Sequence, residues 1–211
     1  MMPREFFAAG GVANVPYIVG TNTEEGALRH LLAIPVQTEQ EFRDALERAF
    51  GADDTTELAA LYPISEFPTP NDALIRVTTD WRYACAVQDF AERIADAGLP
   101  VYAYNFDYPW AEPALRDLLG KSHGAELNYV FGSFIDGMVD VESRALSDLV
   151  QRYWTRFANS GDPNGDTDPS WPLFDPTLGN RLNLNANPSV VESFRQERCN
   201  WWKGYYTSLF E

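Results

Sequence analysis

The chain has 211 residues and a net charge of −15, because its 31 acidic residues outnumber its 16 lysines and arginines. This balance argues against binding to nucleic acids or to an anionic membrane surface, since clustered basic side chains hold both. With two histidines and two cysteines, a tetrahedral zinc site, which usually needs four such ligands, is nearly excluded, and we expect no metal or other cofactor. No apolar run reaches the ~20 residues that span a bilayer.

Short extended segments alternate with amphipathic helical segments, which predicts an α/β fold. Residues 15–20 (VPYIVG) form an apolar run that ends at a glycine and predict a buried strand. Residues 38–41 (TEQE) are a capping box. The helix that it opens places Phe42 and Leu46 on its apolar face, and Gly51 closes it.

The middle of the chain predicts two long helices and one strand. The first helix covers residues 71–97 and stops at Gly98, and a strand rich in aromatic residues follows at 101–108. Apolar positions between 146 and 157 mark the second helix, which ends at Gly161. Aromatic residues of the strand are expected in the core first and as pocket walls second.

The last part of the chain predicts little regular structure before a final helix. Residues 161–165 (GDPNG) form a loop, and residues 171–184 are irregular with room for one short strand. The last helix is expected over residues 190–208. Few strands are predicted, whereas a parallel sheet must be covered on both faces. We therefore expect this chain to be the C-terminal part of a larger domain.

Two polar segments stand where an α/β sheet carries its chemistry. Residues 20–26 (GTNTEEG) directly follow the first strand, and residues 123–132 (HGAELNYVFG) follow the aromatic strand. In doubly wound sheets, catalytic groups lie beyond the carboxyl ends of the strands. A carboxylate followed by a later histidine is the chain order of the last two triad members in an α/β-hydrolase.

Four blocks of the sequence carry a family resemblance. They are residues 15–26, residues 123–132, the stretch 153–164 with Trp171-Pro172 behind it, and residues 198–202 (RCNWW). In this order they resemble the C-terminal part of the type B carboxylesterases, a family that includes cholinesterases and bacterial para-nitrobenzyl esterases. The resemblance implies that residues 1–211 form a single incomplete α/β-hydrolase domain, with few strands of a mostly parallel sheet packed with helices.

The resemblance also implies roles for single residues. Glu25 is the triad acid, which fixes the tautomer of the histidine, and His123 is the general base. Leu28 and Arg29 follow the acid and are expected to line the acyl side of the substrate site. Glu24, beside the acid, is expected to be peripheral. Glu126 is expected to support the histidine through hydrogen bonds, and His30, by itself, to be a surface or packing residue.

The family's nucleophile elbow and oxyanion hole have no match in this chain. A literal Gly-x-Ser-x-Gly occurs at residues 120–124 and nominates Ser122 as a nucleophile. We reject it, because an elbow follows a strand and residues 116–120 do not predict one. The only histidine after Ser122 is its neighbour His123, which is badly placed to take its proton.

Three hypotheses on function remain open. The first is a piece of a serine esterase that hydrolyses carboxylic esters, with Glu25 and His123 supplied here and the chain inactive alone. The second is a non-catalytic, cholinesterase-like interaction module. The third is a split subunit that complements an N-terminal half through the open sheet edge at residues 15–19.

Cys85 and Cys199 are two buried thiols or one disulfide, and composition leaves both open. The family resemblance favours the disulfide, because cholinesterases have one at the corresponding place. A disulfide implies a secreted or periplasmic parent protein, whereas free thiols imply a cytoplasmic enzyme.

Overall fold

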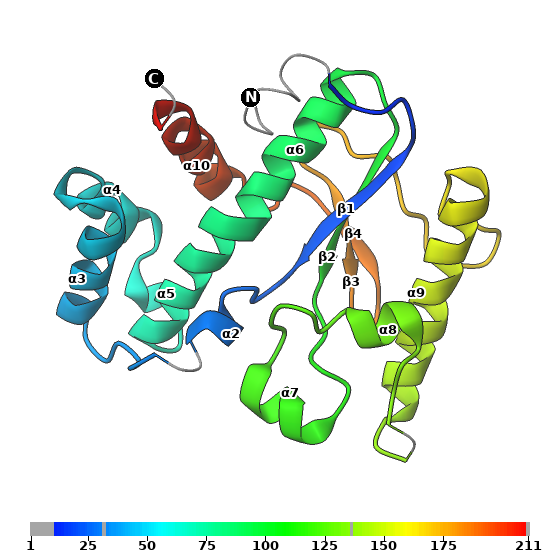
Figure 1. The fold of residues 1–211 in the computed structure, drawn as a ribbon, viewed down its shortest axis with the longest axis horizontal. Helices are drawn as coiled ribbons and strands as arrows, with labels where there is room; N and C mark the ends of the chain where they lie inside the picture. Colours follow the sequence, from blue (N-terminus) through cyan, green and yellow to red (C-terminus); the bar gives the residue numbers. More distant parts are fainter. Residues whose placement is uncertain (1–10, 31–32, 136, 210–211) are drawn as a thin grey trace.

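The structure is a computed structural model that describes residues 11–30, 33–135 and 137–209 (Figure 1). Its strands are β1 (Tyr17–Asn22), β2 (Val101–Phe106), β3 (Arg181–Leu184) and β4 (Ser189–Val191). The helices before β2 are α2 (Ala27–His30), α3 (Glu39–Phe50), α4 (Ala52–Leu61), η1 (Ile64–Glu66), α5 (Pro70–Thr79), η2 (Asp80–Ala84) and α6 (Cys85–Asp96). Those after β2 are α7 (Pro113–Leu119), α8 (Leu127–Phe131), α9 (Val141–Ser160) and α10 (Gln196–Ser208).

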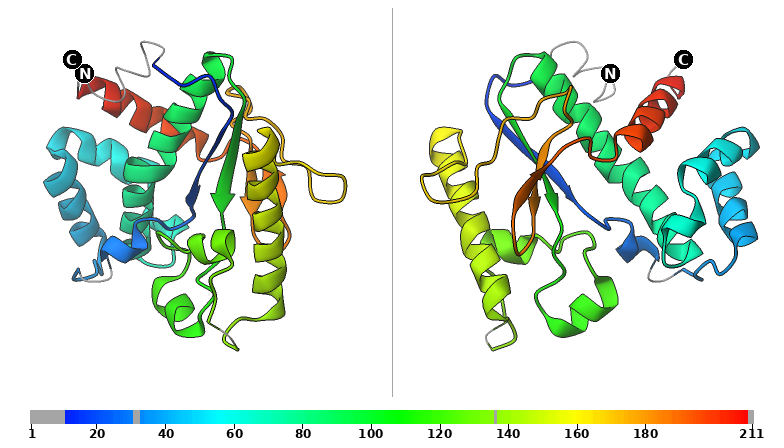
Figure 2. Two further views of the ribbon diagram at one scale, coloured as in Figure 1. Left: turned by 45° about the vertical axis from the view of Figure 1, so that its right-hand side comes forward. Right: turned by 180° about the vertical axis from the view of Figure 1, so that it is seen from behind.

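The strands form one sheet in the order β1-β2-β3-β4, in which β1, β2 and β3 are parallel and β4 is antiparallel. This confirms the predicted α/β fold with a mostly parallel sheet. Successive residues of β2 face opposite sides, so Tyr102 and Phe106 pack with α9, whereas Val101 and Ala103 pack with α6. Figure 2 shows α6 and α9 on the two faces of the sheet.

Strand β1 lies at the end of the described sheet and pairs on one side only, with β2. The predicted strand is present two residues later than expected, and residues 17–20 are half-buried rather than buried. The prediction of a buried strand is therefore wrong for this part, because no described strand covers its outer edge. Gly20 is required here, since a Cβ atom would lie 2.3 Å from the ring of Tyr104 on β2.

Helix α3 begins at the predicted capping box. The side chain of Thr38 accepts from the backbone N–H of Glu41, whose carboxylate accepts from the N–H of Thr38 in return. Gly51 closes the helix with a φ of +91°, which only glycine adopts without strain. The same glycine precedes α4, an element that the sequence analysis did not predict.

The helix predicted over residues 71–97 is present as α5, η2 and α6, which form one continuous helical segment in Figure 1. Its π-helical turn η2 was not predicted. The N–H of Cys85 donates to the carbonyl of Asp80, five residues earlier, where an α-helix would bond over four. The extra residue in this turn changes which side chains of the long helix face its neighbours.

Both ends of η2 are joined to the start of α10. Asp80 has no exposed surface and forms an ion pair with Arg195, and Cys85 forms a disulfide with Cys199. The two anchored positions are five residues apart on the long helix and four apart at α10. One π turn of the long helix therefore faces one α turn at the start of α10. The expected disulfide between Cys85 and Cys199 is confirmed.

The C-terminal prediction needs a correction. The last helix begins at Gln196, so the prediction of helix over residues 190–195 is wrong. Residues 189–191 instead form β4, because the β-branched Val190 and Val191 extend the sheet at β3. Ser193 and Arg195 both have a φ of 52°, and this left-handed backbone turns the chain from β4 into α10.

Within the residues that the structure describes, no helix combines the length and the apolar character that a membrane crossing demands.

Replacing both Cys85 and Cys199 by serine should lower the free energy of unfolding by about 4–5 kcal/mol, because the disulfide closes a long loop in the unfolded chain. The loop spans a sequence separation of 114. Urea unfolding followed by far-UV circular dichroism measures this loss. The reduced wild-type chain is the matched control and should lose as much. Equal midpoints for the oxidised wild type and the double variant would show that the bridge contributes nothing.

Candidate active site

Glu25 lies in a tight turn just after β1. Its carboxylate accepts the backbone N–H of Asn22 at 2.7 Å, so the turn folds back on the end of the strand. The N–H of Gly26 donates to the side chain of Thr79 on α5 at 3.0 Å. A Cβ atom on Gly26 would meet the carbonyl of Ile75 at 2.8 Å, so glycine lets the turn approach the helix. Only 6% of Glu25 is exposed.

His123 lies in the loop between α7 and α8, and the fold brings it to Glu25. Its Nδ1 lies 2.7 Å from Oε2 of Glu25, a hydrogen bond between residues 98 positions apart. The carboxylate is buried, whereas the His123 side chain is 58% exposed. A carboxylate in this position makes Nδ1 the proton-bearing nitrogen and leaves Nε2 without its proton, the form that a general base needs.

The loops that carry Glu25 and His123 are joined directly. The N–H of Glu24 donates to the carbonyl of Lys121 at 3.1 Å, and the N–H of Lys121 donates to the Glu24 carboxylate at 3.2 Å. Gly120 has a φ of +55°, and a Cβ atom there would lie 2.7 Å from that carboxylate. Glu24, expected to be peripheral, therefore holds the loop that leads to His123.

Asn22 is a site residue that the sequence analysis missed. Its side-chain amide donates to the carbonyl of Ser122 at 2.9 Å and to the carboxylate of Glu126. Glu126 thus supports Asn22, one step removed from the histidine that it was expected to support. No local pattern marks this role, because the partners of the side chain lie 100 and 104 residues away in the sequence.

Burial is the largest influence on Glu25 and raises the pKa of its carboxyl group. The hydrogen bonds from Asn22 and His123 act in the opposite direction, and the nearby charge of Glu126 acts with burial. The site therefore keeps a carboxylate where ionisation is costly, and the proton donors around it offset part of that cost.

Ser122 does not have the surroundings of a nucleophile. It has no exposed surface, and its hydroxyl accepts the indole N–H of Trp110 at 3.0 Å. The residues before it form α7, not a strand. This agrees with the rejection of the Gly-x-Ser-x-Gly motif as an elbow.

The residues expected to line the substrate site lie in α2. Leu28 is 43% exposed there, whereas the side chain of Arg29 lies outside the described part of the structure. His30 bonds through Nε2 to the hydroxyl of Thr78 at 2.9 Å, which fits a packing role. Leu28 thus lies in the short helix that directly follows the turn of Glu25.

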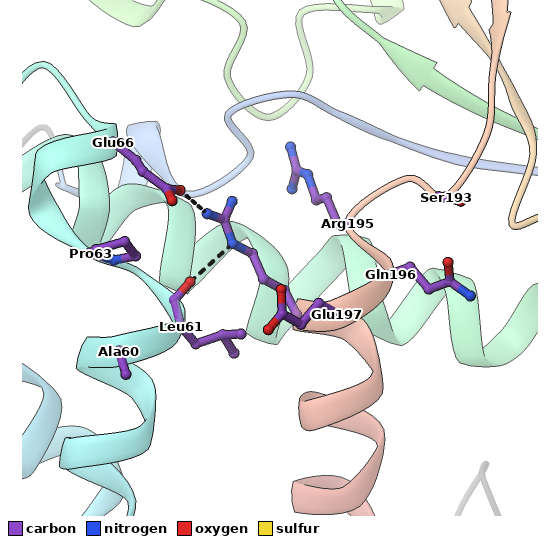
Figure 3. Close-up of a pocket in the computed structure, with 9 residues that line it drawn as sticks. Ala60, Leu61, Pro63, Glu66, Ser193, Arg195, Gln196 and Glu197 are labelled. Atoms are coloured by element: carbon purple, nitrogen blue, oxygen red, sulfur yellow. Dashed lines mark hydrogen bonds and ion pairs between the residues drawn. The ribbon is translucent and has the colours of Figure 1, made fainter.

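Two hollows lie near these elements, and neither is lined by Glu25 or His123. One of about 240 Å³ has Glu24, Gly120 and Leu119 in its wall. The other, of about 540 Å³, lies between η1 and the start of α10 (Figure 3). Arg198 lines it and donates to the carboxylate of Glu66 at 2.8 Å. Across the described residues, no group of three or more metal-binding side chains comes together.

Comparison with known proteins places the chain in a family. The model of the carboxylesterase family matches residues 1–202. The chain is 33% identical to an acetylcholinesterase of Gallus gallus over 75% of its own length and 22% of that protein. It is 28% identical to a liver carboxylesterase of Sus scrofa over 95% of its length and 38% of that protein. A cholinesterase of Mus musculus is 26% identical over the whole chain, which again covers 38% of that protein.

The chain thus spans 22–38% of the length of these relatives. The family model matches most of this chain. The order of strands and helices in the chain is that of part of an α/β-hydrolase fold. The chain belongs to the carboxylesterase family.

Proposed function

We propose that this chain supplies the acid and the base of a serine-type carboxylic ester hydrolase. Glu25 is the acid and His123 the general base, and residues 1–211 are one incomplete α/β-hydrolase domain. The observation that carries the proposal is the 2.7 Å hydrogen bond between Nδ1 of His123 and the buried Glu25 carboxylate. The relatives, which are esterases by name, support the type of reaction.

The proposed chemistry divides the triad between this chain and the upstream part of the domain. His123 takes the proton of a serine supplied by that part and returns it to the alkoxide that leaves the ester. Glu25 stabilises the imidazolium that exists between these two steps. The substrate is a neutral, partly apolar carboxylic ester, with Leu28 and Arg29 on its acyl side. Alone, the chain is inactive.

The open edge of β1 supports a covalent or separate N-terminal half as the partner. The N–H of Tyr17 donates to Pro100 and that of Thr23 to Phe106, so the odd-numbered residues of β1 face β2. Ile18 and Gly20 direct their backbone groups the other way, where no described strand lies. Such an edge is a template for another strand. This observation favours complementation over an independent interaction module.

We also propose a secreted or periplasmic parent protein. The disulfide between Cys85 and Cys199 supports this, because such bonds persist in oxidising compartments.

A fluorophosphonate probe should leave the intact mass of the chain unchanged. Ser122 is buried and bonded to Trp110, and the chain has no other serine in an elbow motif. Intact mass spectrometry with peptide mapping measures any adduct. Labelling at Ser122 would mean that the Gly-x-Ser-x-Gly motif is a working nucleophile.

The role of His123 can be tested in a chimaera that joins this chain to the upstream part of a full-length carboxylesterase. H123Q should lower kcat for p-nitrophenyl acetate by about 10⁴-fold or more, because the base is lost. The matched control is H30Q, which changes the chain's other histidine and should keep its activity. Activity that survives H123Q, or is lost equally in H30Q, would contradict the proposal.

E25Q should raise the free energy of unfolding of the isolated chain at pH 7. Burial raises the pKa of Glu25, so wild-type stability falls as pH rises above the ordinary value of 4.5. The neutral glutamine escapes this cost, and the gain should vanish below pH 4.5. Urea unfolding across this pH range measures it, with E66Q as a control at a carboxylate that is 58% exposed. A pH-independent difference would argue against a costly buried carboxylate.

A further inference from the structure

The imidazole of His123 is held by few contacts for a proposed general base. More than half of its side chain is exposed, and Glu25 holds one edge of the ring through Nδ1. The ring of Tyr83 packs against it, with a centroid separation of 5.3 Å and an interplanar angle of 42°. This lies within the 4.5–7 Å range of favourable aromatic pairs.

We propose that Tyr83 is a positioning residue for His123, whose ring it keeps in the orientation that directs Nδ1 at Glu25. The inference rests on the proposed function, since the orientation of His123 matters to the reaction only if this histidine is the base. Without a packed neighbour, an exposed imidazole rotates about its side-chain bonds and exchanges the Glu25 hydrogen bond for bonds to water. A packed ring restricts that rotation.

The position of Tyr83 is itself fixed by the π turn. Tyr83 lies in η2 between Asp80, which pairs with Arg195, and Cys85, which is bonded to Cys199. The long helix is thus anchored to the start of α10 on both sides of the tyrosine. π turns occur frequently at functional sites, and this one carries the ring that packs against the proposed base.

The tyrosine ring also suits the charge that His123 acquires during the reaction. The face of an aromatic ring carries partial negative charge and attracts a cation within about 6 Å of its centroid. His123 becomes an imidazolium when it takes the proton of the nucleophile. At a centroid separation of 5.3 Å, the ring of Tyr83 lies within this range, so Tyr83 and the Glu25 carboxylate both favour the charged imidazolium.

The test is the lifetime of the His123 Nδ1–H proton in the isolated, isotope-labelled chain. NMR detects this proton when a hydrogen bond to Glu25 protects it from exchange with water. In Y83L we expect exchange to be about two- to tenfold faster, which corresponds to the strength of an ordinary aromatic pair. Y83F keeps the ring and should restore the wild-type lifetime. Y83M fills the space without a ring and decides the question if Y83L does not fold.

The matched control is Y17L, which removes another half-buried tyrosine from an aromatic pair, here with Phe90 at 6.1 Å. It should leave the His123 proton unchanged. A lifetime that is the same in Y83L, or shortened equally in Y17L, would overturn the role of Tyr83 while leaving the proposed function standing. A wild-type chain that shows no protected proton would instead overturn the Glu25–His123 pair, and with it both proposals.

Discussion

A carboxylate with no exposed surface must be compensated, and the structure around Asp80 is organised by that constraint. Arg195 forms an ion pair with it, and the hydroxyl of Tyr62 donates to it at 2.9 Å. The same arginine donates to the carbonyl of Thr23 at 2.9 Å, two residues before Glu25. The long helix, the entry to α10 and the acid turn thus meet at one buried charge pair. Removing one partner of such a pair costs about 3–5 kcal/mol, because the other charge stays buried.

The parts of the fold that could be predicted from sequence are those with local signals. The capping box at Thr38, the stop at Gly98 and the stop at Gly161 each act within one helical turn, so residue types suffice to find them. The π turn η2 could not be found this way, because bonds over four and over five residues need no different composition. Val190 and Val191 are residue types that favour strands. The apolar pattern that follows them nevertheless led to a predicted helix that begins too early in the sequence.

The site was predictable in its chain order and not in its contacts. A carboxylate after a strand and a later histidine suggested the pair, and the family resemblance nominated Glu25 and His123. Their approach to 2.7 Å is a property of the tertiary fold. Asn22 and Tyr83 were missed because each acts on a residue distant in sequence. For Tyr83 the sequence offered only the periodicity of an α-helix. A π turn changes which residues share a face of the helix, so this periodicity could not place Tyr83.

The spacing of the two anchors at η2 determines which helical geometry this part of the chain can adopt. Asp80 and Cys85 are five residues apart, whereas their partners Arg195 and Cys199 are four apart. If the segment took ordinary α-helical geometry with all its residues in place, Cys85 would rotate by about 100° relative to Asp80. Only the ion pair or the disulfide could then form. The π turn thus accommodates one residue more than an α turn and keeps both anchors opposite their partners at α10.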